Sequence, residues 1–341
     1  MSRRQFTGVL LLSSFLLAGV VFRLLIARQV NAHGLRLEWP TTDILQLRVG
    51  AVESALLAGG ALGLSGLLLQ ALLRNPLASP FLLGLSAGAG LGATLVMLSA
   101  TAFNAGVVGW LFGALGIADG VVAGTLGSLV VLAVVYALGR RDGRIDPLTL
   151  VLSGTVVSSI CGALTLLAQS LLPPSSRGDS WMWFMGQIPE VPSPGLALLT
   201  AMLLLGMVIV AWRSGRALDA ASTSDDEAES LGVSLKHLRV MLFVGAGALA
   251  SASVALCGPL AFVGFVAPHM SRLVIGAQHR ALVPASVVAG AALLVWADAI
   301  RQVIDFGAGR LPIGVLTALI GGPVFLGVLR SRRLVPGGWS C

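Results

Sequence analysis

Charged side chains are scarce in this chain of 341 residues, of which only 11% are Asp, Glu, Lys or Arg. Soluble domains carry about 25% charged residues, so this composition excludes an ordinary water-soluble fold. Hydrophobic residues reach 56%. They stand in long continuous runs rather than alternating with polar residues, which excludes a porin-type barrel. The sequence therefore predicts an all-α integral membrane protein.

Side chains on which most enzymes and metal sites depend are also few. The three cysteines, Cys161, Cys257 and Cys341, have no metal-type spacing and are too few for a disulfide framework. The pattern G-x-x-x-x-G-K-[ST] is absent, and the only lysine, Lys236, follows no glycine-rich loop. We therefore expect no enzyme activity and no cofactor or metal bound by this chain. The net charge of +7 lies mostly at the ends of apolar runs, where it sets topology rather than binding nucleic acid.

Apolar segments, each able or nearly able to cross a bilayer, divide residues 1–341 into about ten spans of a single transmembrane domain. A spanning helix needs about 20 apolar residues. The segments lie at about 6–28, 51–72, 80–100, 107–139, 148–172, 195–212, 237–256, 260–275, 281–304 and 312–329. The first begins like a signal peptide but lacks a clear small-residue cleavage site, so we interpret it as the first span.

Arginine positions predict the orientation of these spans. Ten spans place both termini on one side, and the clusters at 140–144 and 330–333 fall on that side. An excess of basic residues marks the cytoplasmic side of a membrane protein, so both termini are predicted to be cytoplasmic. Arg23 remains within the first span and is expected to extend outward to the membrane interface.

Acids within spans could indicate a carrier driven by an ion gradient, because ionisable residues inside a membrane are usually functional. Glu53, Asp119 and Asp298 are the acids near or within the predicted spans, and Glu53 lies close to the end of its span. This position weakens the carrier interpretation, which we keep as a distant alternative.

Two segments outside the spans carry recognisable local signals. The outer segment at about 173–195 contains Trp181 and Trp183 among prolines, and we expect a short helix at the membrane interface. The inner segment at about 222–236 predicts a short helix. Ser224 can cap it, three acids favour its start, and Gly232 can end it. The acids are Asp225, Asp226 and Glu227, and the apolar pair Ala228 and Leu231 lies three apart on one face. Both a solvated loop and a docking helix for a cytoplasmic partner remain open on these local grounds.

Three stretches carry a closer resemblance. They are "GGALGLSGLLLQALLRNPLASPFLLGLSAGAGLGA" at 59–93, "GPLAFVGFVAPHMSRLVIGAQHRALVP" at 258–284 and "RLPIGVLTALIGGPVFLGVL" at 310–329. The chain is identified by them as resembling the permease subunits of FecCD/BtuC-type ABC importers. The segment "EAESLGVSLKHLR" at 227–239 is similar to the cytoplasmic coupling segment of that family. The similarity runs from about residue 47 through most of the chain.

The resemblance implies a BtuC-like type II ABC importer fold in a bacterial plasma (inner) membrane. A second permease chain, either an identical copy or a close paralogue, would complete a central pathway. Two cytoplasmic ATPases would bind ATP and Mg, and an external solute-binding protein would deliver the cargo. The cargo implied first is an iron–siderophore complex, with haem or vitamin B12/cobinamide as the alternatives.

The resemblance also assigns roles to particular residues. The coupling helix would fit the ATPase through Ala228 and Leu231. A broken half-helix near 258–275 would have its helix ladder interrupted at both ends by Pro259 and Pro268. The pathway and half-helix residues are Gly258, Pro259, Gly264, Pro268 and His269, and the motif loop contains Gln70, Arg74, Asn75 and Pro76. For His269 we expect a buried, hydrogen-bonded structural residue, with contact to the ATPase or the pathway as the alternative.

Docking of the binding protein is implied to depend on outer arginines, here Arg48, Arg301 and Arg310. The chain departs from the family pattern at this surface. Ala51 stands where a second arginine is usual, Arg310 replaces a glutamate, and Glu53 occupies a position that is usually apolar. We therefore expect a docking surface that is basic but rearranged.

Overall fold

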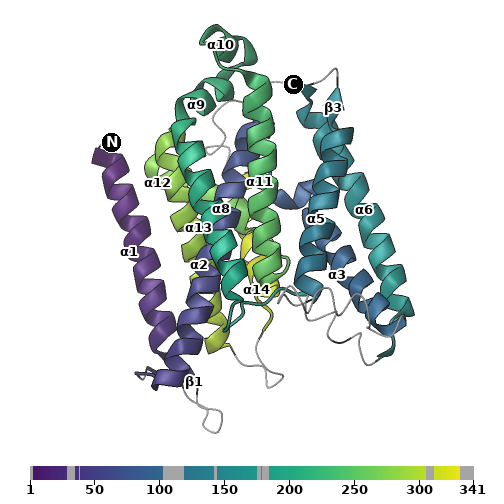
Figure 1. Cartoon of the computed structure of the whole chain (residues 1–341). Coiled ribbons are helices and arrows are strands. Elements are labelled where there is room, and N and C mark those ends of the chain that lie inside the picture. Colours follow the sequence, from purple (N-terminus) through teal and green to yellow (C-terminus); the bar gives the residue numbers. More distant parts are fainter. Residues whose placement is uncertain are drawn as a thin grey trace.

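The computed structural model describes residues 3–28, 35–37, 39–102, 119–141, 144–174, 178, 184–304 and 311–330. Helices dominate this part of the chain, which confirms the all-α prediction (Figure 1). The long helices are α1 (Arg3–Leu25), α2 (Thr42–Leu73), α3 (Leu85–Ala102), α5 (Asp119–Leu138), α6 (Pro147–Leu171), α8 (Pro194–Arg213), α11 (Leu235–Cys257), α12 (Val263–Ile275), α13 (His279–Val303) and α14 (Ile313–Arg330).

Short elements connect the long helices. The antiparallel pair β1 (Ile26–Arg28) and β2 (Leu35–Leu37) lies between α1 and α2, and β3 (Arg140–Arg141) pairs with β4 (Arg144–Ile145) between α5 and α6. A 3-10 helix, η1 (Pro80–Leu83), precedes α3. Two further helices, α9 (Gly215–Thr223) and α10 (Asp225–Ser230), extend beyond α8 and α11 at the top of Figure 1.

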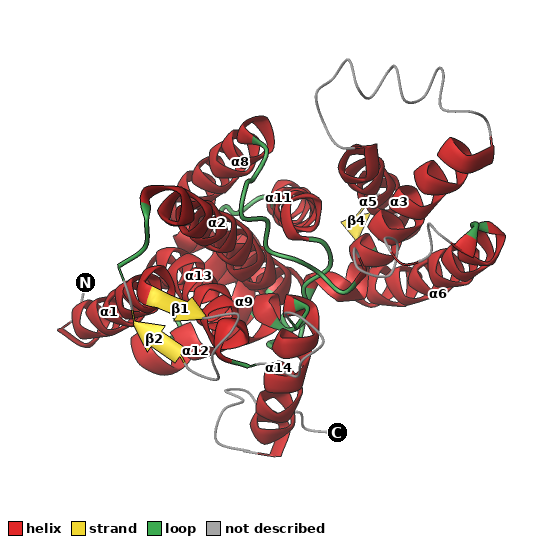
Figure 2. Ribbon diagram, turned by 90° about the horizontal axis from the view of Figure 1, so that it is seen from below, coloured by secondary structure: helices red, strands yellow, loops and turns green. Residues whose placement is uncertain are grey.

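The centre of the bundle is occupied by α2. A helix that is apolar on all sides is normally buried, and α2 packs against α8, α11, α12 and α13 (Figure 2). Its 32 residues give it a length of about 48 Å, against a hydrocarbon thickness of about 30 Å. The helix therefore begins nine residues before the predicted span, because its first turns, with Asp43 and Arg48, reach beyond the apolar layer.

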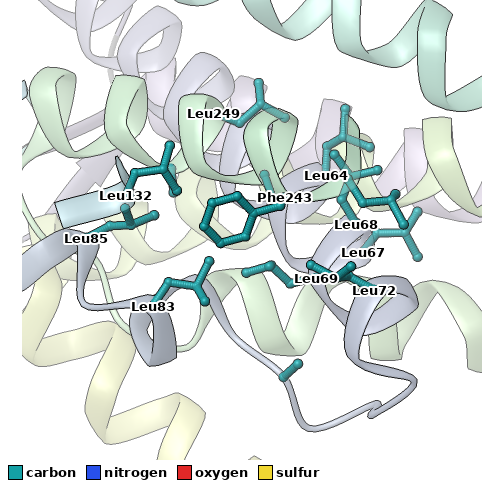
Figure 3. Packing of buried hydrophobic residues seen from close by; sticks show 14 of the residues in the cluster. Leu64, Leu67, Leu68, Leu69, Leu72, Leu83, Leu85, Leu132, Phe243 and Leu249 are labelled. Carbon is teal, nitrogen blue, oxygen red and sulfur yellow. The ribbon is translucent and has the colours of Figure 1, made fainter. Parts of the chain in front are cut away.

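Leucines of α2 form the largest core cluster together with residues of α11, η1, α3 and α5. Leu64, Leu67, Leu68 and Leu69 belong to the same cluster as Phe243 of α11, and Leu83, Leu85 and Leu132 lie on the ring side of Phe243 (Figure 3). Lipid tails are as apolar as leucine, so close van der Waals packing rather than escape from water stabilises such contacts in a bilayer.

A second group of helices stands beside the α2 bundle. α3, α5 and α6 pack on one another, and α11 joins them to the rest (Figure 2). Six helices are long and apolar enough to span a membrane, and four shorter apolar helices accompany them among the described residues. The count of ten spans therefore stays a prediction. The predicted span at 107–139 is described only from Asp119. In the predicted interfacial segment, residues 175–177 and 179–183, which include Trp181 and Trp183, lie outside the described residues.

Candidate functional site

The predicted coupling segment forms the helix α10, which begins directly after Ser224, while the preceding helix α9 ends at Thr223. The backbone of Ser224 is extended, and its hydroxyl accepts a hydrogen bond from the Glu227 N–H at 3.0 Å, as a helix N-cap does. At the other end Gly232 has a φ of +79°, and Val233 N–H donates to Ala228 O at 2.9 Å. The capping and ending signals read from the sequence are confirmed, and α10 occupies a shorter range than predicted.

The two apolar residues of α10 have different surroundings. Ala228 is completely buried within the chain, whereas Leu231 is 67% exposed. The prediction that both would contact a partner is therefore wrong for Ala228, because the neighbouring elements already cover it. Leu231 projects from the top of the molecule, in the region where Glu227 and Glu229 are also exposed.

The start of α10 is held by ion pairs that sequence spacing did not reveal. Asp225 accepts hydrogen bonds from Arg239 of α11 at 2.7 and 3.0 Å. It also pairs with Arg74, which caps the end of α2. No local sequence pattern links Asp225 to Arg74. The two residues come together only through the packing of helices, which places the end of α2 beside the end of α9.

The motif loop after α2 makes a compact turn. Arg74 adopts a left-handed backbone with a φ of +46°, and Asn75 N–H reaches back to Gln70 O at 3.2 Å. The Asn75 side chain then accepts from Leu77 N–H at 2.9 Å, and Pro76 lies within this turn. Gln70 contacts Arg272 of α12. The motif residues thus connect α2 with α12 on one side and with α9 and α10 on the other.

A hydrogen-bonded pair fastens α9 to the beginning of α13. Asp219 Oδ1 accepts from the His279 backbone N–H at 2.9 Å and lies 2.7 Å from His279 Nδ1. Partial burial opposes ionisation of Asp219, but the hydrogen bonds from His279 and the charges of His279 and Arg280 lower the pKa of this carboxyl. The helices α9 and α10 are therefore held by hydrogen bonds and ion pairs to α2, α11 and α13.

The broken segment is confirmed at its beginning and revised at its end. α11 ends at Cys257, Gly258 has a φ of +72°, and the chain passes Pro259 before α12 begins at Val263. Pro268 lies inside α12 rather than ending it, so the prediction of a break there is wrong. A proline cannot donate to the carbonyl four residues earlier, and the Gly264 carbonyl freed in this way lies against the backbone of α2.

This contact brings α2 and α12 together at two glycines. A Cβ added at Gly66 would lie 1.6 Å from Gly264 O, and one added at Gly264 would lie 3.0 Å from Leu62 O. No side chain fits between the two backbones. A carbonyl without a helix partner is tolerated in a membrane where protein covers it, which is the situation of Gly264.

His269 is buried, as expected, but without the expected hydrogen bond to its Nε2. Its ring stacks on Phe265 with 6.2 Å between centroids, and Nε2 finds no hydrogen-bond partner among the described residues. Phe265 in turn meets Phe325 of α14 edge to face at 4.9 Å. The half-helix α12 is therefore packed between α2 and α14.

Of the three predicted docking arginines, Arg301 does not lie at an exposed surface. Arg301 has a side chain only 6% exposed, and it pairs with Asp298, which is fully buried. Asp298 also binds Arg23 of α1, so the prediction that Arg23 extends outward is wrong. Arg48 is half-buried and donates to Leu24 O. Arg310 lies outside the described residues.

The outer half of α2 borders an open groove of about 1080 Å³. The loop at 190–194 and the first turns of α8 form the other wall, which is largely apolar. Glu53 is exposed on α2 and lines this groove together with Asp43 and Glu190. The unusual position of Glu53 noted in the sequence thus corresponds to an acidic edge of the groove beside the first half of α2.

A profile of the FecCD transport family matches residues 36–331. The chain belongs to the FecCD transport family. Among curated proteins, this FecCD chain is 32% identical over 289 residues to the Hemin transport system permease protein HmuU of Yersinia pestis, covering 85% of this chain and 83% of HmuU. It is 34% identical to the Vitamin B12 import system permease protein BtuC of Klebsiella pneumoniae, covering 97% and 95% of the two chains.

Solved structures also show a fold similar to that of this FecCD chain. An inward-facing structure of a metal-chelate type ABC transporter matches with a TM-score of 0.79 and 26% identity, covering 96% of this chain and 99% of the other. PsaBC from Streptococcus pneumoniae, solved with a Fab, matches with a TM-score of 0.51 and 15% identity, and that likeness concerns the fold alone. The FecCD chain is thus a multi-pass ABC importer permease, a type of subunit that is not itself catalytic.

Proposed function

We propose that this permease imports a metal chelate, with an iron–siderophore complex as the first cargo, and that ATP hydrolysis by a partner chain drives the transport. The observation that carries the proposal is α10, a capped short helix on a FecCD fold, with Leu231 exposed at its end. A helix this short is not stable alone. A role in receiving force from an ATPase explains why ion pairs and caps hold it in place.

The assembly that follows contains two permease chains, two ATPases that bind ATP and Mg, and one binding protein on the outer side. The end with α10 would face the cytoplasm, with both termini on that side of a bacterial inner membrane. Arg48 and Arg310 stay as proposed docking residues for the binding protein. Arg301 would contribute only after leaving Asp298, because its side chain is buried and paired.

Cargo identity requires a transport experiment with competing chelates. The permease is reconstituted in liposomes with its ATPases and binding protein, and uptake of an iron–siderophore complex, haemin and cobalamin is measured in parallel. We expect ATP-dependent uptake of the iron–siderophore complex above the other two. Preference for haemin or cobalamin would replace that cargo while keeping the architecture. Uptake driven by an ion gradient without ATP would favour the secondary-carrier alternative.

The control for this experiment is a transporter whose partner ATPase carries a substitution that stops ATP hydrolysis. In that assembly the permease inserts and assembles normally, and uptake of every chelate should fall to the level of empty liposomes. If uptake persists, the ATP-driven mechanism is contradicted regardless of which chelate is preferred.

A further inference from the structure

Asp225 is the meeting point of several elements at the proposed cytoplasmic end. It is the first residue of α10. Arg239 of α11 donates to both of its carboxylate oxygens, and Arg74 at the end of α2 binds one of them. The Nε of Arg74 also donates to Ala221 O of α9 at 2.7 Å. The carboxylate therefore ties α2, α9, α10 and α11 together at one position.

Arg74 occupies a backbone conformation that normally favours glycine. Its φ is +46°, and a residue with a side chain costs about 1 kcal/mol there relative to its usual conformation. Strained positions of this kind often mark functional contacts. A glycine would close the same turn after α2 without strain, but it would supply neither the contact with Asp225 nor the bond to Ala221.

The end of α2 also leads directly to the half-helix. Gln70 lies about one turn before Arg74 on α2 and contacts Arg272 of α12. Two glycine backbones, Gly66 and Gly264, bring α2 and α12 into direct contact one further turn along. A displacement of α10 that moves Arg74 therefore reaches α12 through a short series of packed and hydrogen-bonded contacts.

We propose that Asp225, Arg74 and Arg239 form a clamp that makes α10 move as one body with α2 and α11. This inference rests on the proposed function, because it assumes that a cytoplasmic ATPase pushes or pulls α10. Leu231 contacts the ATPase, and the Asp225 clamp transmits the displacement to the membrane helices. The three clamp residues are positioning residues, since they act through the helices they connect rather than on the cargo.

The test is the Asp225→Asn variant in the complete transporter, reconstituted in lipid with its ATPases and binding protein. The measured quantity is the number of cargo molecules transported per ATP hydrolysed. Asn keeps the size of the side chain but removes its negative charge and replaces one acceptor oxygen by an NH2 donor, so both arginines lose their counter-charge. We expect the ratio to fall about tenfold, the equivalent of about 1.4 kcal/mol. Because the pair is half-exposed, high salt should reduce the difference from the parent.

The matched control is Asp43→Asn, which removes the same charge from the exposed opposite end of α2 and should keep the parental ratio. A second variant, Arg74→Gly, keeps the left-handed turn and removes the clamp. It should show the same loss in transport per ATP with an unchanged thermal midpoint in detergent. A purely structural role of Arg74 would instead move that midpoint.

Three outcomes would overturn the clamp. If both Asp225→Asn and Arg74→Gly transported as many cargo molecules per ATP as the parent, the motion of α10 would reach α2 without the clamp. Loss of the ATPases from the purified Asp225→Asn complex would make Asp225 part of the docking surface, which contradicts the clamp while supporting the proposed function. Absence of ATP-driven uptake in the parent transporter would remove the proposed function and the clamp with it.

Discussion

Asp298 is a single carboxylate that balances two buried arginines from different helices. Its side chain is fully buried, and it binds Arg23 of α1 and Arg301 of α13. Removing one partner of a buried ion pair is far more costly than losing a surface pair, because a charge remains without compensation. Asp298 should therefore fix α1 against α13 and keep Arg301 away from the outer surface.

Replacement of Asp298 by Asn should destabilise the protein strongly. Two buried guanidinium groups would lose their counter-charge, at a cost of about 3–5 kcal/mol. We expect a large decrease in the thermal midpoint of the purified protein in detergent. Arg23→Met is the matched control. It leaves one ion pair, Asp298 with Arg301, whose opposite charges still cancel in an apolar surrounding. Equal midpoints for Asp298→Asn and Arg23→Met would contradict this charge balance.

Residues differ in how well the sequence alone predicts their role. Ser224 and Gly232 were correctly assigned, because capping depends on neighbours three or four positions away. The partners of Asp298 and Asp225 were not, since Arg23 is 275 positions from Asp298 in the chain. Long-range pairs of this kind depend on helix packing, and one sequence carries no local signal for them.

At the scale of elements, the exposed end of α10 provides the sharpest prediction. Leu231→Asp places a charge on a residue that is 67% exposed, so the isolated permease should fold and insert as before. Within a partner groove the same charge would be buried without a counter-charge, at a cost of about 3–5 kcal/mol. We expect ATP-driven transport to be lost in reconstituted liposomes. Leu231→Met is the control, and normal transport by Leu231→Asp with its ATPases bound would contradict the coupling role.

The crossing of α2 and α12 gives a second prediction at this scale. Gly66→Ala would place a methyl group 1.6 Å from Gly264 O, so the two helices must separate. Overpacking of this kind costs about 1–3 kcal/mol, and we expect a lower thermal midpoint together with slower transport. Gly206→Ala in α8 is the control, because nothing lies within 4 Å of its added methyl group. Equal midpoints for the two variants would show that the crossing is not tight.

Elements were predicted well where a continuous apolar run coincided with a helix, as in α6, α8 and α11. The prediction was less accurate where a local rule met tertiary packing. Pro268 was expected to end a helix, but the Gly66 backbone covers the carbonyl that Pro268 leaves free, so α12 continues to Ile275. The inner segment was predicted at about 222–236 with Ser224 as its cap. The helix α10 begins after that cap, as predicted, but it ends already at Ser230.

For the whole molecule, the packed centre decides where a large cargo can pass. The middle of the bundle is filled by α2, whose Leu64, Leu67, Leu68 and Leu69 have no exposed surface. A chelate of the size of haem or cobalamin cannot cross such a core. A pathway between two copies related by a two-fold axis avoids this obstacle, which is why we expect two permease chains in each assembly.

The last prediction identifies the side of the molecule that faces the second copy. We expect the half-helix α12 to lie near the interface between the two permease chains, and α14 packs on this half-helix through Phe262, Phe265 and Phe325. A cysteine introduced at Leu319 of α14 should therefore cross-link to its copy with a short bifunctional maleimide in native membranes. A cysteine at Met202 of α8, on the opposite side of the bundle in Figure 2, should not, although the two positions are almost equally exposed, at 66% and 65%. The background for all variants is the chain with Cys341→Ser, in which the remaining Cys161 and Cys257 are buried. Native mass measurement in mild detergent should show two permease chains in each assembly. A transporting assembly with one permease chain would contradict this arrangement. Cross-linking at position 202 but not at position 319 would contradict it as well.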